Sequence, residues 1–203
     1  MLIKNPGLVS LIYMLKILGY TSGILMALSV VPYARSIFRL ETKPQRMTWL
    51  IWSILTLIAF FSQLAEGGTW SLLLTVGDTL AILIIFFLSI KFGVGGFRKI
   101  DILSLCGAGV SLILWYLTNE AAVALFFIIL TDLIGANLTI TKTWKNPETE
   151  NWVGWAMCGV GGLLGTLAVG KLDFVLISFP LYVCLINSAI AIIILARKRK
   201  VIL

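Results

Sequence analysis

The chain has 203 residues, of which 60% are hydrophobic and 12% are charged, and its mean hydropathy is +1.04. Soluble domains are about 45–50% apolar, so this composition excludes a soluble protein and predicts an all-α transmembrane protein surrounded by lipid. The formal net charge is +7, but the basic residues stand between apolar runs, a pattern typical of membrane orientation rather than of nucleic-acid binding.

Apolar runs of about 20 residues, separated by short polar turns, predict seven membrane-spanning helices. Their expected limits are 15–38, 47–65, 70–91, 101–118, 120–141, 151–169 and 173–196. The first apolar run already begins near residue 7 and is interrupted by Lys16, whose ammonium group a helix end could carry to the membrane surface. The start of the first helix is therefore open between residues 7 and 15. No small-x-small cleavage site follows the N-terminal run, so we expect this run to be retained.

The basic residues predict the orientation of these helices. If successive turns are assigned alternately to two sides, the side away from the N-terminus carries 13 of the 16 basic residues. These residues are Arg35, Arg39, Lys43, Arg46, Lys91, Arg98, Lys99, Lys142, Lys145, Arg197, Lys198, Arg199 and Lys200. Only Lys4, Lys16 and Lys171 fall on the other side. We therefore expect an outside N-terminus, a cytoplasmic C-terminus and a multi-pass protein of the cell inner (plasma) membrane.

One segment of the chain recurs 103 residues later. Pro32–Trp52, with the sequence PYARSIFRLETKPQRMTWLIW, aligns without a gap with Gly135–Trp155, GANLTITKTWKNPETENWVGW. The matched pairs include Ile37 with Ile140, Arg39 with Lys142, Pro44 with Pro147, Trp49 with Trp152 and Trp52 with Trp155. Each copy holds the end of an apolar helix, a basic turn and the start of the next helix, which predicts an internal repeat.

The repeat and the topology together predict a 3+1+3 arrangement. Helices 1–3 match helices 5–7, and the fourth helix restores the chain direction, so that both units cross the membrane the same way. We expect an N-terminal segment and first three-helix bundle in 1–92, a linker helix in 93–118, and a second three-helix bundle with a basic C-terminus in 119–203.

This plan resembles the PQ-loop superfamily, which includes the SWEET sugar transporters, the lysosomal cystine and cationic amino-acid exporters, and the ER-retrieval receptor. The resemblance covers nearly the whole chain from about residue 17. It implies two parallel three-helix bundles joined by a linker helix, with the N-terminus outside. The segment DLIGANLTITKTWKNPETEN also looks like a group of uncharacterised bacterial PQ-loop-like membrane proteins. That kinship implies a fold and not a substrate.

The Pro-Gln motif of the family does not correspond to the literal Pro44-Gln45. In the family the motif lies within the first helix of each bundle and precedes a short basic turn, and the matching positions here are Pro32-Tyr33 and Gly135-Ala136. The resemblance implies that Pro32 and Gly135 act as hinges for alternating access. The second copy has neither Pro nor Gln, so we expect the two hinges to be unequal and the mechanism to be asymmetric.

Two acids lie within apolar spans, Asp78 in LLLTVGDTLAILI and Asp132 in FFIILTDLIGANL. At 1.5 Å per residue, both fall in the middle third of the hydrocarbon core. A charge there costs about 2.5–3.5 kcal/mol, so such residues face the protein interior and commonly mark an ion or substrate path. The alternative is that each is a buried polar anchor, hydrogen-bonded to a neighbouring helix. As path residues, the two carboxyls are candidates for proton coupling or for pairing with a substrate.

Asn137 and Asn187 also lie within apolar runs, where they could hydrogen-bond a polar solute or join neighbouring helices. The resemblance supports Asn187, because sugar-transporting members carry a pocket Asn in the third helix of each bundle. Gly77 and Pro180 stand 103 residues apart and weaken their helices at mid-depth, so both are candidate bend points. The glycines of GVGGLLG, at 159–165, predict a helix that neighbours approach closely.

The tryptophans are the most repeated feature of the two copies. Trp49 and Trp152 open a helix at the cytoplasmic boundary, where aromatic belts form. Trp52 and Trp155 lie one turn deeper, and we include them in the substrate path as the floor of a cavity. Belt positions are the alternative for this pair as well.

Enzymatic and metal chemistry find no support in the sequence. It has no histidine, no HExxH, no GxSxG and no P-loop. Cys106, Cys158 and Cys184 each lie in an apolar run without a CxxC spacing, which is typical of packing. The last apolar run has no lysine between Lys171 and Arg197 that could carry retinal. We expect no cofactor and no metal.

Two functions remain open. The first is a membrane transporter or facilitator for a small polar solute, with alternating access between the bundles and a carboxyl that could link it to protons. The second is a non-transporting membrane receptor or adaptor on the PQ-loop fold, whose basic turns would face a cytoplasmic partner. The expected partners are the lipid bilayer and a small polar solute, and the chain could act as a monomer or a small homo-oligomer. Fold alone does not decide between these functions.

Overall fold

In the computed structural model, which describes residues 6–41, 44, 46–94 and 99–202, every regular element is a helix. The helices are α1 Pro6–Leu28, α2 Val30–Phe38, α3 Arg46–Ala65, α4 Leu72–Phe92, α5 Lys99–Thr118, α6 Ala121–Lys145, the 3₁₀ helix η2 Pro147–Thr149, α7 Trp152–Leu167 and α8 Phe174–Ile202. Lys4, Lys43, Gln45 and Arg98, used above for orientation and for the Pro44-Gln45 turn, lie outside the described residues. The all-helical prediction is confirmed.

Six helical segments within the described ranges are long and apolar enough to cross a membrane, with α1 and α2 counted as one. The chain is therefore a multi-pass membrane protein by the length and composition of its helices. The predicted helix at 151–169 forms as α7, but its 16 residues span only about 24 Å, less than a typical hydrocarbon core of about 30 Å. The first helix begins at Pro6, which supports the earlier of its two possible starts.

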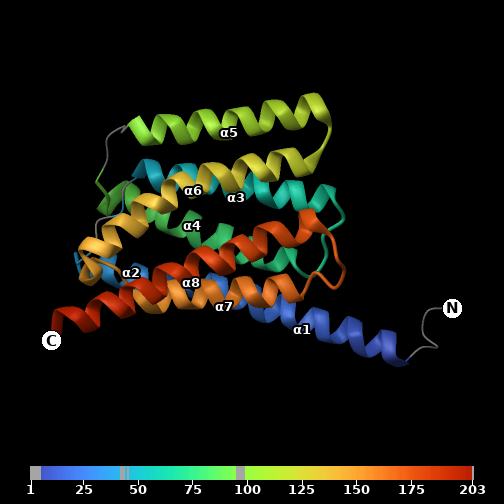
Figure 1. Ribbon diagram of the computed structural model, residues 1–203, viewed down its shortest axis with the longest axis horizontal. Coiled ribbons are helices and arrows are strands. Elements are labelled where there is room, and N and C mark those ends of the chain that lie inside the picture. The colour runs from blue at the N-terminus through green and yellow to red at the C-terminus, as the bar shows by residue number, and fades with distance from the viewer. Residues whose placement is uncertain (1–5, 42–43, 45, 95–98, 203) are drawn as a thin grey trace.

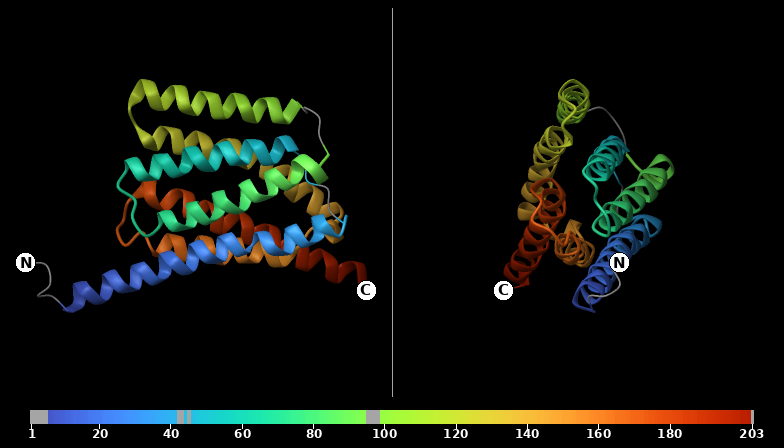
Figure 2. Two further views of the ribbon diagram at one scale, coloured as in Figure 1. Left: turned by 180° about the vertical axis from the view of Figure 1, so that it is seen from behind. Right: turned by 90° about the vertical axis from the view of Figure 1, so that its right-hand side faces the viewer.

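The helices pack in two groups of three, each with one helix in the middle. The helix α4 lies between α1 and α3, and α8 lies between α6 and α7. Across these two groups, α1 packs on α7 and α3 packs on α6, while α5 lies at the edge against α6 and α3 (Figures 1 and 2). In Figure 1, α1, α4, α6 and α8 run from right to left, and α3, α5 and α7 run from left to right. The helices α1 and α6 thus run in the same direction, as do α3 and α7, and α4 and α8.

Glycines allow α1 and α4 to touch backbone to backbone. A Cβ added at Gly19 would lie 2.4 Å from the Trp70 carbonyl oxygen, and one at Gly77 would lie 2.2 Å from the Gly23 carbonyl oxygen. Gly19 and Gly23 are spaced as a small-xxx-small motif, which permits such an approach between helices in lipid. Gly77, proposed above as a bend point, is thus a contact point in this structure.

The glycine-rich α7 is approached on two faces, as GVGGLLG predicts. Gly161 and Gly165 face the first group of helices, where an added Cβ would meet Met26 Sδ at 2.8 Å and a Leu74 side-chain carbon at 2.4 Å. Gly162 faces α8, where an added Cβ would lie 2.4 Å from the Cys184 backbone nitrogen. Close contact with both neighbours places this short helix at the junction of the two groups.

The first apolar segment is interrupted close to Pro32. The α-helical pattern is interrupted between α1 and α2 at Ser29, three residues before Pro32. Proline lacks the N–H that would bond the carbonyl four residues earlier, and its ring crowds that carbonyl. At the same place, Ser29 Oγ donates to the Met26 carbonyl at 2.6 Å. Pro180, by contrast, lies inside the continuous helix α8.

Candidate functional site

A cavity of about 460 Å³ lies between the two groups of helices, and Ser29 and the helices α2 to α8 all contribute to its wall. Its lining includes Thr48, Thr139 and Asn151, so it reaches the ends of the helices beside the α2–α3 and α6–α7 turns. The opposite half of the protein is filled by buried apolar side chains such as Leu74 and Leu125. The cavity therefore extends to one end of the bundle and is closed at the other.

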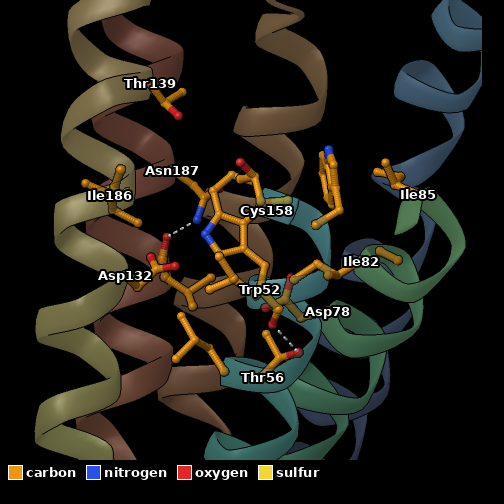
Figure 3. Close-up of a pocket in the computed structure, with 18 of the residues that line it drawn as sticks. Trp52, Thr56, Asp78, Ile82, Ile85, Asp132, Thr139, Cys158, Ile186 and Asn187 are labelled. Carbon is orange, nitrogen blue, oxygen red and sulfur yellow. Dashed lines mark hydrogen bonds between the residues drawn. The ribbon is translucent and has the colours of Figure 1, made fainter. Parts of the chain in front are cut away.

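Five of the six residues that the sequence suggests for a solute path line this cavity: Trp52, Asp78, Asp132, Trp155 and Asn187 (Figure 3). Asn137 does not line it and is exposed on the outer surface of α6. Five residues separate it from Asp132, and at about 100° per residue this turns Asn137 roughly 140° away from the cavity face. Once the face of α6 that points into the cavity is known, the spacing between Asp132 and Asn137 predicts that Asn137 points outward.

The two mid-span acids come from different helix groups and have different surroundings. The Tyr182 hydroxyl on α8 donates a hydrogen bond to an Asp132 carboxylate oxygen. No hydrogen bond to the Asp78 carboxylate is found within the described part of the chain. Asp78 lies beside Trp52 and Thr56 in Figure 3, and its charge interacts with that of Asp132. One acid is thus held by a neighbour while the other is open to the cavity.

Three tryptophans form part of the cavity wall near the α2–α3 and α6–α7 turns. The Trp49 and Trp52 rings meet edge to face with centroids 5.1 Å apart, and Tyr33 packs on Trp49 at 5.3 Å. Trp155 Nε1 donates to Glu150 Oε2 at 3.1 Å. Trp49, expected in the interfacial belt, lines the cavity together with Trp52 and Trp155. Its counterpart Trp152 is 40% exposed and faces outward.

Asn187 and Gly135 complete the central part of the wall. Asn187 Nδ2 donates to the Val183 carbonyl one turn earlier at 2.8 Å. Gly135 stands opposite Trp52, where an added Cβ would lie 3.7 Å from the indole Nε1. The absence of a side chain at Gly135 thus leaves room beside the Trp52 ring. Pro32 lies outside the lining, close to Gly154 of α7.

Sequence reasoning missed several polar groups of the cavity, among them the acids Asp101 and Glu150 and the Tyr182 hydroxyl. Asp101 is only 3% exposed, although it stands in the first turn of α5. The signal that could have found it is Ser104, one turn further along the same apolar run. With Asp78 and Asp132, these residues give the cavity four acidic side chains, and neither Lys nor Arg occurs among its described lining residues.

The lining positions recur along the chain with two offsets. Positions on α2 and α3 and at Ser29 recur 103 residues later: Ser29 and Asp132, Tyr33 and Ala136, Thr48 and Asn151, Ile51 and Gly154, Trp52 and Trp155, Leu55 and Cys158. Positions on α4 recur on α8 after 101 residues: Asp78 and Phe179, Ala81 and Tyr182, Ile82 and Val183, Ile85 and Ile186. Gly77 and Pro180, 103 apart, are therefore not equivalent in relation to the cavity.

In comparisons with protein-family models, curated proteins and solved structures, no match to this chain is found. A function therefore has to be argued from the cavity itself.

Proposed function

We propose that the protein is a membrane transporter or facilitator for a small polar solute, working by alternating access between two three-helix bundles. The observation that carries this proposal is the cavity itself, which lies between the two helix groups and is lined by both mid-span acids. A receptor or adaptor would need no such space in the middle of its apolar core, because close packing there stabilises the fold. Intramembrane acids that face a cavity usually mark a solute or ion path.

The packing of the helices supports the 3+1+3 plan of the PQ-loop superfamily. In each group the third helix lies between the other two, and α1 meets α7 as α3 meets α6. These contacts are what a two-fold axis along the membrane normal would generate from two parallel repeats. The recurrence of lining positions after 103 and 101 residues supports the same internal repeat. In this plan α5 is the linker helix.

The proposed mechanism begins with the cavity open to the cytoplasm. The positive-inside rule assigns the α2–α3 and α6–α7 turns to the cytoplasmic side of the inner membrane, and the cavity extends to that end. On the outer side, Gln63 Nε2 donates to Thr75 Oγ1 at 3.1 Å, and both side chains are fully buried. Alternating access requires the bundles to separate at this outer end while the end beside the α2–α3 and α6–α7 turns closes, with the helix interruption at Ser29, near Pro32, as a hinge.

Asp132 is the residue assigned to proton linkage. Its carboxylate faces the cavity from α6 and is bonded to Tyr182 on α8, so a proton or solute arriving there alters a contact between two helices of one bundle. Asp78 on α4 faces the same space from the other bundle. Binding at the two carboxyls can therefore act on both bundles at once.

Asp132→Asn tests the proposal in proteoliposomes with a broad panel of metabolites and an imposed proton gradient. We expect the variant to lose proton-dependent flux while its elution in gel filtration and its melting temperature stay close to those of the unaltered protein. Glu120→Gln, which alters an exposed acid just before the first residue of α6, is the matched control and should keep the flux. Unchanged flux in Asp132→Asn would contradict its proton role. A panel in which no solute moves would favour the receptor alternative.

A further inference from the structure

We infer that the cavity binds a small organic cation that carries no carboxylate group. This inference rests on the proposed function, because it names the class of solute that would occupy the same site. Three properties of the wall point to it: its charge, an acid open to the cavity, and its aromatic and aliphatic surface.

The described charged side chains that line the cavity are all acidic. Asp78 and Asp132 face it from the two helix groups, and neither Lys nor Arg occurs among its described lining residues. A solute carboxylate would leave water without gaining a cationic partner and would face acids instead. Amino acids and organic acids therefore fit the wall poorly. A cation gains on entering, because acidic groups in a poorly solvated space attract it strongly.

Asp78 is the acid that an incoming cation would meet. It lies deep inside the protein, its side chain is partly exposed only because it borders the cavity, and no hydrogen bond to it is found in the described ranges. A buried carboxylate without a partner is costly, and an ammonium group can supply the missing charge-assisted hydrogen bonds. Asp132 already accepts the Tyr182 hydroxyl, so it is the weaker or second contact.

The rest of the wall fits an organic cation better than a bare metal ion. Trp52 lies beside Asp78, and its ring can hold an alkylammonium group by a cation–π interaction. Ile82 and Ile186 face the same space and offer apolar surface to an alkyl stem. Within the described residues, no three acidic, histidine or cysteine side chains are grouped as a metal ion would need. The volume of about 460 Å³ suits a small molecule.

A matched series of linear compounds tests this inference on the full-length protein in detergent, by isothermal titration calorimetry. Cadaverine, 1,5-pentanediol and glutarate share a five-carbon chain and differ in charge, and lysine is cadaverine with one carboxylate group added. We expect cadaverine to bind, lysine and pentanediol to bind at least tenfold more weakly, and glutarate not to bind. Equal binding of lysine, pentanediol or glutarate, or no binding of cadaverine, would overturn the cation assignment.

Two variants locate the site. Asp78→Asn should weaken cadaverine binding at least tenfold, and Glu120→Gln, which lies outside the cavity, should leave it unchanged. The ligand series on the unaltered protein stands even if Asp78→Asn fails to fold. Flux assays separate this inference from the transport proposal. Cadaverine binding that depends on Asp78 without any flux would refute transport and keep the cation site, whereas flux of a neutral solute without cadaverine binding would refute the cation site and keep transport.

Discussion

Replacing Gly77 with alanine should destabilise the protein, because α1 and α4 meet there through their backbones. The added Cβ would lie 2.2 Å from the Gly23 carbonyl oxygen and 2.9 Å from the carbonyl carbon. Neither atom belongs to a flexible side chain that could rotate away. The two helices would have to move apart along an interface that Gly19 and Gly23 also hold close.

The size of the effect follows from that displacement. To bring the added Cβ to an ordinary contact distance, the two helices would have to move apart by about 1 Å. A gap of that size weakens each neighbouring dispersion contact by about a quarter to a half. Overpacking of this kind costs about 1–3 kcal/mol, and rigid backbone on both sides favours the upper end. For a chain of 203 residues, a loss of about 3 kcal/mol corresponds to a fall of roughly 6–12 °C in melting temperature.

Thermal unfolding in detergent, followed by intrinsic fluorescence or by gel filtration after heating, measures this fall. Gly109→Ala on α5 is the matched control, because nothing lies within 4 Å of the added Cβ. This control should be neutral or stabilising by up to about 1 kcal/mol through helix propensity. An unchanged melting temperature for Gly77→Ala, or equal losses in both variants, would refute the close approach of α1 and α4.

Two further predictions concern the cavity. Gly135→Ala should leave the melting temperature nearly unchanged, because the added Cβ would stand 3.7 Å from Trp52 Nε1, an ordinary contact. If Gly135 is a hinge, this variant should slow flux in proteoliposomes at unchanged stability, and an unchanged flux would remove that role. In a protein whose other cysteines are replaced by alanine, Cys158 should react several-fold faster with a trimethylammonium methanethiosulfonate than with its sulfonate analogue, after correction for their rates with free cysteine. The acidic lining of the cavity should attract the cationic reagent and repel the anionic one. Mass spectrometry measures both reaction rates, and a faster reaction with the sulfonate would contradict an acidic cavity.

The positions of the helices could be predicted because lipid imposes a length and an apolar composition on each span. The expected range 47–65 is observed as Arg46–Ala65, and 101–118 as Lys99–Thr118. The start of the first helix was open because Lys16 interrupts the apolar run. In the structure α1 continues through Lys16. The Lys16 ammonium group lies 5.9 Å from the Tyr20 ring centroid and 5.5 Å from that of Trp70, which stabilises the charge there.

The composition of the cavity could be predicted only in part. Asp78 and Asp132 stand out because a buried charge in lipid is costly, whatever the fold around it. The outward direction of Asn137 depends on how α6 is rotated, which no local pattern in the sequence determines. Glu150 and Asp101 join the site from turns and helix ends, where acids are common and carry no signal of their own. Such residues become visible only when the turns are placed over the cavity.

The two offsets bear directly on the proposed mechanism. If the helix groups are repeats, Asp78 corresponds to Phe179 and Asp132 corresponds to Ser29, so neither acid has an acidic counterpart in the other group. A cation between them would meet a carboxylate from the third helix of one bundle and a carboxylate from the first helix of the other. If the bundles rock as proposed, these two contacts change by different amounts, because the two helices move differently about the cavity. The proposed solute site would thus be built from unlike parts of similar units, and its two walls would release a bound cation one after the other.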